Sequence, residues 1–160
     1  MTMNDTTLEA VKDIDVLRVM ERIPHRYPFL LVDRVDEVVP YEKAIGIKCV
    51  SMGEPYFQGH FPGKPVMPGV LIIESMAQTA GVMVVTSLGP ESEGKLVYFM
   101  SIEEAKFRRP VVPGDRLEVH VSKKQNRGAV WKFRGEAFVD GKLVAEAVFA
   151  AMIRDRDENA

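Results

Sequence analysis

Two side chains in unlike surroundings, His60 and Glu74, carry the chemistry that this sequence can support. His60 stands in a loop dense in glycine and proline, GHFPGKPVMPG, which covers residues 59–69. Glu74 stands in the apolar stretch that follows, residues 70–88, where burying an unpaired carboxylate is costly. A histidine close to a desolvated glutamate would form a general base and a general acid.

Two further residues extend this candidate site. Gln78 follows Glu74 by four positions, so both lie on one face of a helix, where the amide can hydrogen-bond the carboxyl group and orient it. Gly69 stands at the expected start of that helix, where backbone N–H groups are unpaired and the helix dipole is positive. A carbonyl oxygen that acquires negative charge could be stabilised there.

Burial also favours the protonation states that such a site needs. Desolvation raises the pKa of a carboxyl group and lowers that of a histidine, so a protonated Glu74 and a neutral His60 can coexist near neutral pH. This pair suits removal of a proton beside a carbonyl group and protonation of a leaving hydroxyl group. The simpler alternatives are a histidine that serves only the turn and a Glu74 that pairs with a buried arginine. The combination with Gly69 and Gln78 favours catalysis.

The composition argues against several other classes of site. The net charge of −2 gives no overall support for nucleic-acid binding. The single cysteine, Cys49, excludes an intrachain disulfide and a cysteine-based metal cluster, and it fits a reducing, cytoplasmic compartment. The three histidines, His25, His60 and His120, have no ligand spacing that joins them, so no metal site is expected.

The apolar stretch 70–88 is long enough to cross a membrane, but we expect it to be the buried helix of a soluble protein. It carries Glu74 and Gln78, and its flanks lack the Lys, Arg or aromatic anchors of a membrane span. The first 15 residues are polar and include four acidic ones, which predicts no secretory signal. A cytoplasmic protein with no membrane partner is therefore expected.

The ends of the chain are polar and lack periodicity. They predict disordered tails over residues 1–14 and 154–160, on either side of one domain at residues 15–153. At 160 residues and 46% hydrophobic content, the chain can build one real core. Asp15 is expected to cap a short helix that Pro24 ends.

Strand-forming patterns occupy most of the remaining chain. Runs rich in valine and isoleucine predict strands over residues 29–39 and 44–50. The C-terminal half is expected to be all strand, with alternating runs that begin at Leu117, Trp131 and Leu143. Asp140–Gly141 predicts a hairpin turn between the last two runs.

These elements predict an α+β architecture in which a curved antiparallel sheet wraps around the long helix. The apolar face of the sheet needs a cover, and the long helix is the element able to supply it. A helix that is apolar on nearly all sides needs burial all round, and one sheet covers only one side. We therefore expect a second copy of the chain to cover the rest.

Three ordered motifs resemble one enzyme family, the FabZ-type 3-hydroxyacyl-acyl-carrier-protein dehydratases of bacterial fatty-acid synthesis. They cover HFPGKPVMPGVLIIESMAQTAG (His60–Gly81), IPHRYPFLLVDR (Ile23–Arg34) and KFRRPVVPGD (Lys106–Asp115). The similarity extends over about residues 15–153, with no departure at the catalytic positions. It implies a hotdog fold, which agrees with the helix-in-sheet architecture reached from the residues.

The resemblance also implies a mechanism and partners. His60 would be the base at the α-carbon of the substrate, Glu74 the acid that releases the hydroxyl group as water, and the Gly69 N–H the donor to the thioester carbonyl. In the family, the histidine of one subunit meets the glutamate of its partner, and dimers commonly associate into a hexamer. The substrate arrives on the acidic acyl carrier protein, which would dock on Lys106, Arg108 and Arg109. No metal or organic cofactor is expected.

Two other functions fit the same scaffold. A hotdog thioesterase would hydrolyse acyl thioesters and release a free thiol, although such enzymes do not share this His-to-Glu spacing. A non-catalytic acyl-binding or regulatory module would tolerate the loss of His60. The motifs favour the dehydratase over both.

Overall fold

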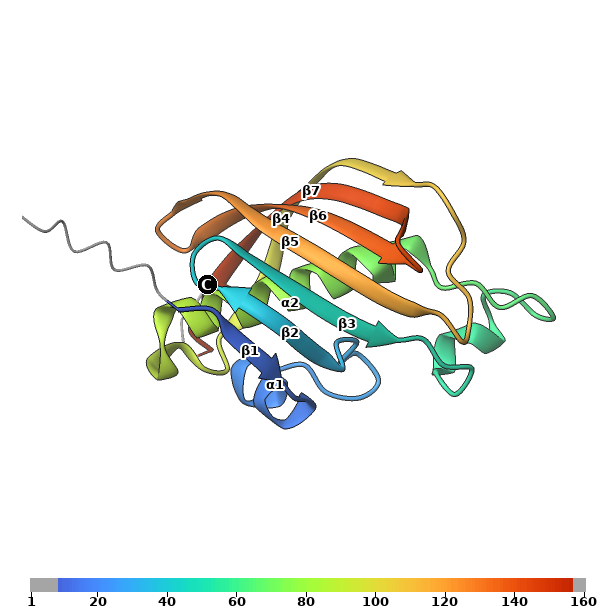
Figure 1. Cartoon of the computed structure of the whole chain (residues 1–160), viewed down its shortest axis with the longest axis horizontal. Coiled ribbons are helices and arrows are strands. Elements are labelled where there is room, and N and C mark those ends of the chain that lie inside the picture. Colours follow the sequence, from blue (N-terminus) through green and yellow to red (C-terminus); the bar gives the residue numbers. More distant parts are fainter. Residues whose placement is uncertain (1–8, 157–160) are drawn as a thin grey trace, which may run out of the picture.

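A seven-stranded antiparallel sheet wraps around one long helix in the computed structural model, which describes residues 9–156 (Figure 1). Neighbouring strands follow the order β1-β2-β3-β5-β6-β7-β4. The strands are β1 (Val11–Ile14), β2 (Arg34–Val39), β3 (Lys43–Cys49), β4 (Leu96–Phe107), β5 (Arg116–Arg127), β6 (Val130–Val139) and β7 (Lys142–Arg154). The helices are α1 (Val16–Arg22) and α2 (Gly69–Leu88), with short 3-10 turns η1 (Pro55–Gln58) and η2 (Pro90–Ser92). The predicted α+β hotdog fold is confirmed.

Helix α2 is the element around which the core is built. It begins one residue before the predicted stretch 70–88 and ends where expected, at Leu88. Gly89 stops it with a φ of 106°, a conformation open to glycine, and donates its N–H to the Val85 carbonyl. Its length and composition would allow a membrane span, but 72% of that stretch is buried inside the molecule. It is therefore a core helix, as predicted.

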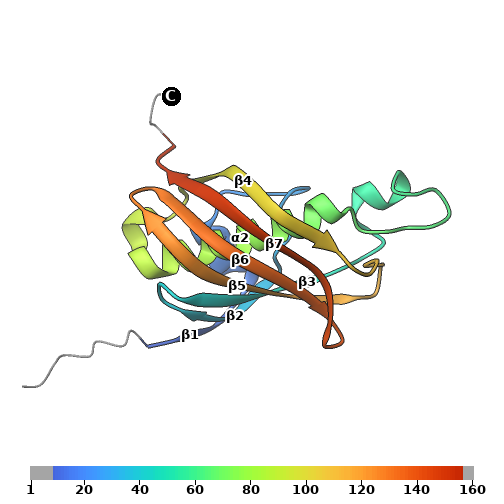
Figure 2. The same cartoon turned by 90° about the horizontal axis from the view of Figure 1, so that it is seen from above.

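The curved sheet and α1 together enclose the middle of α2 (Figures 1 and 2). Gly135 on β6 lies so close to the helix that a Cβ there would be 2.5 Å from the Met76 sulfur. Gly81 of α2 faces Ile23, which follows α1, and Val97 of β4. The prediction that one sheet leaves the rest of the helix open is thus wrong for its middle, because curvature and α1 bury it within one chain.

Apolar surface stays open at the edge of the sheet instead. In the part of the chain that the structure describes, β4 pairs with β7 and its other edge has no partner. Large apolar side chains on this strand are exposed, namely Tyr98, Phe99, Met100, Ile102 and Phe107. No alternating run is predicted here from the sequence, because the apolar residues of β4 follow one another without the strict alternation that indicates a half-buried strand.

The predicted tails need one correction. Residues 1–8 and 157–160 lie outside the described residues, but Val11–Ile14, within the predicted tail, forms β1 and buries Ile14. This strand exists because the edge of β2 offers it hydrogen bonds, and four residues are too few to show a pattern. At the other end, β7 continues to Arg154, one residue past the predicted domain.

The predicted strand 29–39 also begins late, at Arg34. The Leu31 N–H donates to Gln78 Oε1 at 2.8 Å, and Gln78 Nε2 donates to the Phe29 carbonyl at 2.7 Å. Because these backbone groups bind the side chain of Gln78, they cannot form the hydrogen bonds that join neighbouring strands of a sheet. This segment therefore lies against α2 rather than in the sheet. The short helix before it matches its prediction, because Asp15 accepts the Arg18 N–H as the N-cap of α1.

Candidate active site

The buried side chain of Gln78 orients Glu74, as the spacing of four residues predicts. Gln78 Nε2 lies 3.0 Å from Glu74 Oε1. The same amide binds the backbone of Phe29 and Leu31, and Gln78 is fully buried. Since its carbonyl oxygen accepts an N–H and its nitrogen donates to a carbonyl group, the amide can present only an N–H group to Glu74.

The surroundings of Glu74 favour its protonated form. Burial raises the pKa of this carboxyl group, and the hydrogen bond from Gln78 opposes the shift only in part. The side chain is 14% exposed, so a substrate can still reach it. A carboxyl group that keeps its proton to a higher pH than usual is suited to act as a general acid.

His25 is the neighbour of Glu74 that sequence reasoning missed. Its Nε2 lies 3.5 Å from Glu74 Oε1, and its Nδ1 is buried without a hydrogen-bond partner among the described residues. Burial, and then the charge of Arg26, lower the pKa of His25, so its ring is neutral at physiological pH. The sequence places His25 among three histidines in a weak metal pattern and within the Ile23–Arg34 motif, but it assigns the residue no role at Glu74.

Arg26 holds the turn that carries His25. Its guanidinium group donates to the backbone carbonyl groups of Met20, Ile23 and His25, at 2.9, 3.0 and 2.7 Å. These bonds tie the residues after α1 to the end of that helix. Both residues fall in the Ile23–Arg34 motif, which was the one signal that could have drawn attention to them.

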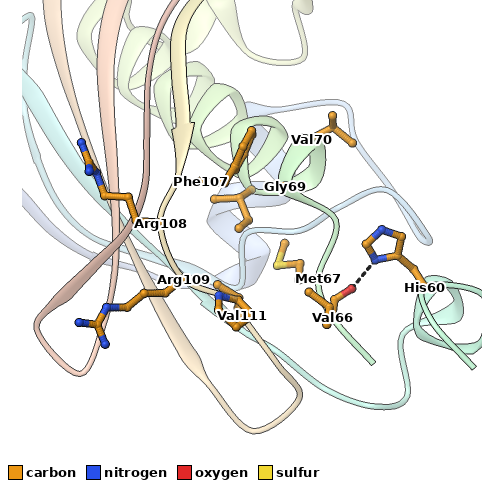
Figure 3. A pocket seen from close by; sticks show the side chains of 11 residues that line it. His60, Val66, Met67, Gly69, Val70, Phe107, Arg108, Arg109 and Val111 are labelled. Atoms are coloured by element: carbon orange, nitrogen blue, oxygen red, sulfur yellow. Dashed lines mark hydrogen bonds between the residues drawn. The ribbon is translucent and has the colours of Figure 1, made fainter. Parts of the chain in front are cut away.

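His60 lies apart from Glu74 within one chain. It stands on the segment between η1 and α2, which extends away from the body of the fold (Figure 1). Its Nδ1 lies 2.6 Å from the Val66 carbonyl oxygen (Figure 3), and the Val66 N–H donates to the His60 carbonyl at 2.8 Å. Because a carbonyl group only accepts, Nδ1 carries a proton, and in the neutral tautomer this leaves the lone pair on Nε2. This geometry is compatible with the predicted role of His60 as a base.

A cavity of about 390 Å³ brings His60 together with the start of α2 (Figure 3). Gly69 lines it, and its N–H has no hydrogen-bond partner among residues 9–156, as expected at a helix N-terminus. The Phe107 ring covers Gly69 so closely that a Cβ there would lie 2.6 Å from the ring. Glycine is therefore required at the position predicted to bind the thioester carbonyl.

The three predicted docking residues lie near this cavity but differ in their contacts. Arg108 and Arg109 line it, whereas Lys106 stands on β4 outside the lining. Arg108 pairs with Glu146 at 3.3 Å, and this hydrogen bond holds the pKa of Glu146 below its usual value. The Arg109 guanidinium group has no partner among the described residues, and in Figure 3 it extends away from Gly69.

The described residues contain no group of three or more His, Cys, Asp or Glu side chains that could hold a metal ion. His120 lies half exposed on β5, where its Nε2 is 3.3 Å from Glu118 Oε2. Among residues 9–156 it forms no hydrogen bond or ion pair with His25 or His60.

A family model described as the FabA-like domain matches residues 23–148. The chain belongs to the FabA-like family. The 3-hydroxyacyl-acyl-carrier-protein dehydratase FabZ of Paramagnetospirillum magneticum is 64% identical over 152 residues, 95% of this chain and 94% of the relative. The same enzyme of Rhodospirillum rubrum is 61% identical over 144 residues, 90% of each chain. Within its family this chain is thus of the FabZ type, an enzyme of the lyase class.

Solved structures support the fold independently. The dehydratase heterocomplex ApeI:P from Xenorhabdus doucetiae superposes with a TM-score of 0.74, covering 88% of this chain and 93% of the other, at 18% identity. Cj0977, a sigma28-regulated virulence protein from Campylobacter jejuni, gives 0.61 at 13% identity, with 91% and 92% covered. At such low identity these likenesses concern the fold alone.

Proposed function

We propose that this member of the family eliminates water from a (3R)-3-hydroxyacyl thioester on acyl carrier protein and forms the trans-2-enoyl thioester. The observation that carries the proposal is the partly buried Glu74 carboxyl group, whose pKa is raised by burial and whose orientation Gln78 holds. Relatives more than 60% identical over nearly the whole chain are named as dehydratases for such substrates. A place in bacterial fatty-acid synthesis follows from that substrate.

The proposed mechanism uses one base and one acid. His60 Nε2 removes a proton from the α-carbon, and the electrons of that C–H bond form the double bond. Glu74 gives its proton to the β-hydroxyl group, which leaves as water when the C–O bond breaks. The Gly69 N–H stabilises the charge that develops on the thioester oxygen. Transfer of a proton from the imidazolium of His60 back to Glu74 then restores both groups.

The site requires two copies of the chain. His60 and Glu74 do not meet among the residues that the structure describes, although each is prepared for its role. A homodimer in which His60 of one protomer faces Glu74 of its partner would complete the site. The open edge of β4 and its exposed apolar side chains are suited to pairing with a second copy. Association of three such dimers into a hexamer stays a prediction from the resemblance.

An acidic carrier protein would approach the basic mouth of the cavity. Lys106, Arg108 and Arg109 lie on β4 or directly after it, and all three are exposed. Arg109 is the strongest candidate because its guanidinium group has no partner among the described residues. A cytoplasmic location, which such a carrier requires, stays a prediction from the sequence.

Product analysis tests this function. The purified protein should hydrate crotonyl-CoA or a crotonyl-carrier-protein thioester, seen as loss of the enoyl absorbance, without releasing free thiol. His60→Ala and Glu74→Gln should each lose roughly 10²-fold or more of the rate while remaining folded. Release of thiol would instead identify a thioesterase, and binding of the acyl thioester without turnover would identify a binding module.

A further inference from the structure

A buried ion pair lies at the base of the segment that carries His60. Lys48 on β3 is 4% exposed, the one charged side chain that is buried among residues 9–156. Its Nζ lies 2.5 Å from Glu54 Oε1. The same oxygen accepts the Tyr56 hydroxyl at 2.8 Å, and Glu54 Oε2 accepts the Ser51 N–H at 2.9 Å. Both carboxylate oxygens are thus occupied.

Stability alone does not account for a lysine at this position. Alternation along β3 puts Lys48 on the same face as Ala44 and Gly46, and Gly46 lies directly against Thr79 of α2. An apolar side chain would be the usual choice on this face. A buried ion pair seldom stabilises a fold more than apolar residues of similar volume do, because both charges must be desolvated. A pair that adds little stability can still fix one local geometry.

The geometry that this pair fixes leads directly to His60. Glu54 immediately precedes η1, and its carboxylate turns back to Lys48 instead of capping the turn. Burial, and then the hydrogen bond to Glu54, raise the pKa of Tyr56, so its hydroxyl group remains a donor. Phe57 is buried in the core beside Tyr56, with ring centroids 4.6 Å apart. Two residues later the chain reaches Gly59 and His60.

The far side of the segment has its own attachment. Val66 binds His60 through two hydrogen bonds, and the Met67 N–H donates to the Val111 carbonyl at 2.7 Å. Between these attachments, Phe61 is exposed, and a Cβ added at Gly63 would have no other atom within 4 Å. The orientation of His60 therefore depends on how the two ends of the segment are attached, and Glu54 forms the attachment at the N-terminal end.

We propose that the Lys48–Glu54 ion pair, together with the Tyr56 hydroxyl, is a positioning device that sets the place of the His60 ring. The inference rests on the proposed function only for its kinetic consequence. A general base must be placed to within about 1 Å, since a misplacement of that size can cost as much as 10²-fold in rate. The pair acts through the backbone of η1 and does not touch the substrate.

Three variants test the proposal. Lys48→Met keeps the length of the stem without the charge, Glu54→Gln keeps the shape of the carboxylate, and Tyr56→Phe removes one hydrogen bond. We expect kcat for hydration of the enoyl thioester to fall roughly 10- to 100-fold in the first two, with KM nearly unchanged. The double variant should lose no more than either single one, because the two residues act as a unit. Lys95→Met, which breaks the ion pair with Asp155 far from the His60 segment, is the matched control and should keep full activity.

Hydrogen exchange gives a readout that does not depend on activity. The amides of Phe61, Lys64 and Val66 are hydrogen-bonded within the segment and should exchange faster in the variants, while those of α2 keep their protection. Unchanged exchange in this segment, or additive losses of kcat, would overturn the proposal even if the wild type is a dehydratase. If the wild type has no hydratase activity, the proposed function fails, and exchange alone decides the role of the pair. Should Lys48→Met not fold, Glu54→Gln and Tyr56→Phe carry the same test.

Discussion

His25 Nε2 lies 3.5 Å from Glu74 Oε1, on the same carboxylate oxygen that Gln78 binds. Burial shifts the two groups in opposite directions, with the pKa of His25 lowered and that of Glu74 raised. Both shifts suppress charge, so a neutral ring can lie beside a protonated carboxyl group near neutral pH. Each protomer thus holds the proposed acid, Glu74, in this pocket and the proposed base, His60, on a separate segment.

The raised pKa of Glu74 predicts a pH-dependent cost to stability. Below the ordinary carboxyl pKa of 4.5, Glu74 is protonated in both the folded and the unfolded chain and costs nothing. As the pH rises from there through the raised folded pKa, the unfolded chain releases the proton more readily, and the free energy of unfolding falls. Glu74→Gln removes this effect. The variant should gain Tm relative to the wild type at pH 8 and show no gain at pH 4 in paired thermal unfolding scans; an equal shift at both pH values would contradict it.

Two substitutions separate the polarity of His25 from its bulk. His25→Leu makes the surroundings of Glu74 more apolar, which further disfavours the carboxylate and should move the alkaline limb of the kcat–pH profile upward. His25→Gln keeps an N–H group within reach of Glu74 and should leave that limb close to the wild-type position. We expect kcat to fall about tenfold in His25→Leu and less in His25→Gln. Identical profiles for the two variants would show that His25 only fills space.

Gly69 should tolerate no side chain while Phe107 covers it. A Cβ at Gly69 would lie 2.6 Å from the Phe107 ring, so Gly69→Ala must displace the ring or the helix start. Loss of an oxyanion donor costs roughly 10²–10³-fold in kcat, and we expect a loss approaching that range. Adding Phe107→Ala makes room for the methyl group and should recover part of the rate. If the loss of kcat in the double variant equals the combined losses of the two single variants, the clash between the methyl group and the Phe107 ring is not the cause.

Arg109 should matter only when the substrate is carried by a protein. Arg109→Ala removes an exposed cation at the mouth of the cavity and should raise KM for the carrier-protein thioester several-fold, more so at low salt. Turnover of an uncharged pantetheine thioester should not change. Lys124→Ala, on the exposed part of β5, is the control for net charge. An equal rise of KM in both variants would argue against docking at Arg109.

Local patterns predicted the parts of the fold that local forces determine. The bounds of α2 were nearly correct because no proline interrupts it and Gly89 ends it, and the Glu74–Gln78 contact follows from helix geometry alone. The alternating runs of β5 and β6 were visible because one face of each is buried, whereas β7 is buried along most of its length and was recognised by its apolar residues.

Contacts between distant segments could not be read in the same way. β1 forms only because β2 has an open edge, and residues 29–33 leave the sheet because Gln78 binds their backbone. The neighbours of Glu74 and of Glu54 come from other elements, His25 after α1 and Lys48 on β3. No spacing along the chain indicates either pair.

Complementation between two inactive variants tests most directly whether the acid–base dehydratase site is shared between two protomers. His60→Ala and Glu74→Gln, co-expressed with different tags and purified through both, form mixed dimers with one intact site each. Each variant alone should be nearly inactive, whereas the doubly purified mixed dimers should recover about half of the wild-type hydratase activity, since each has one intact site of two. Mixed dimers that assemble but remain as inactive as the single variants would contradict the shared site.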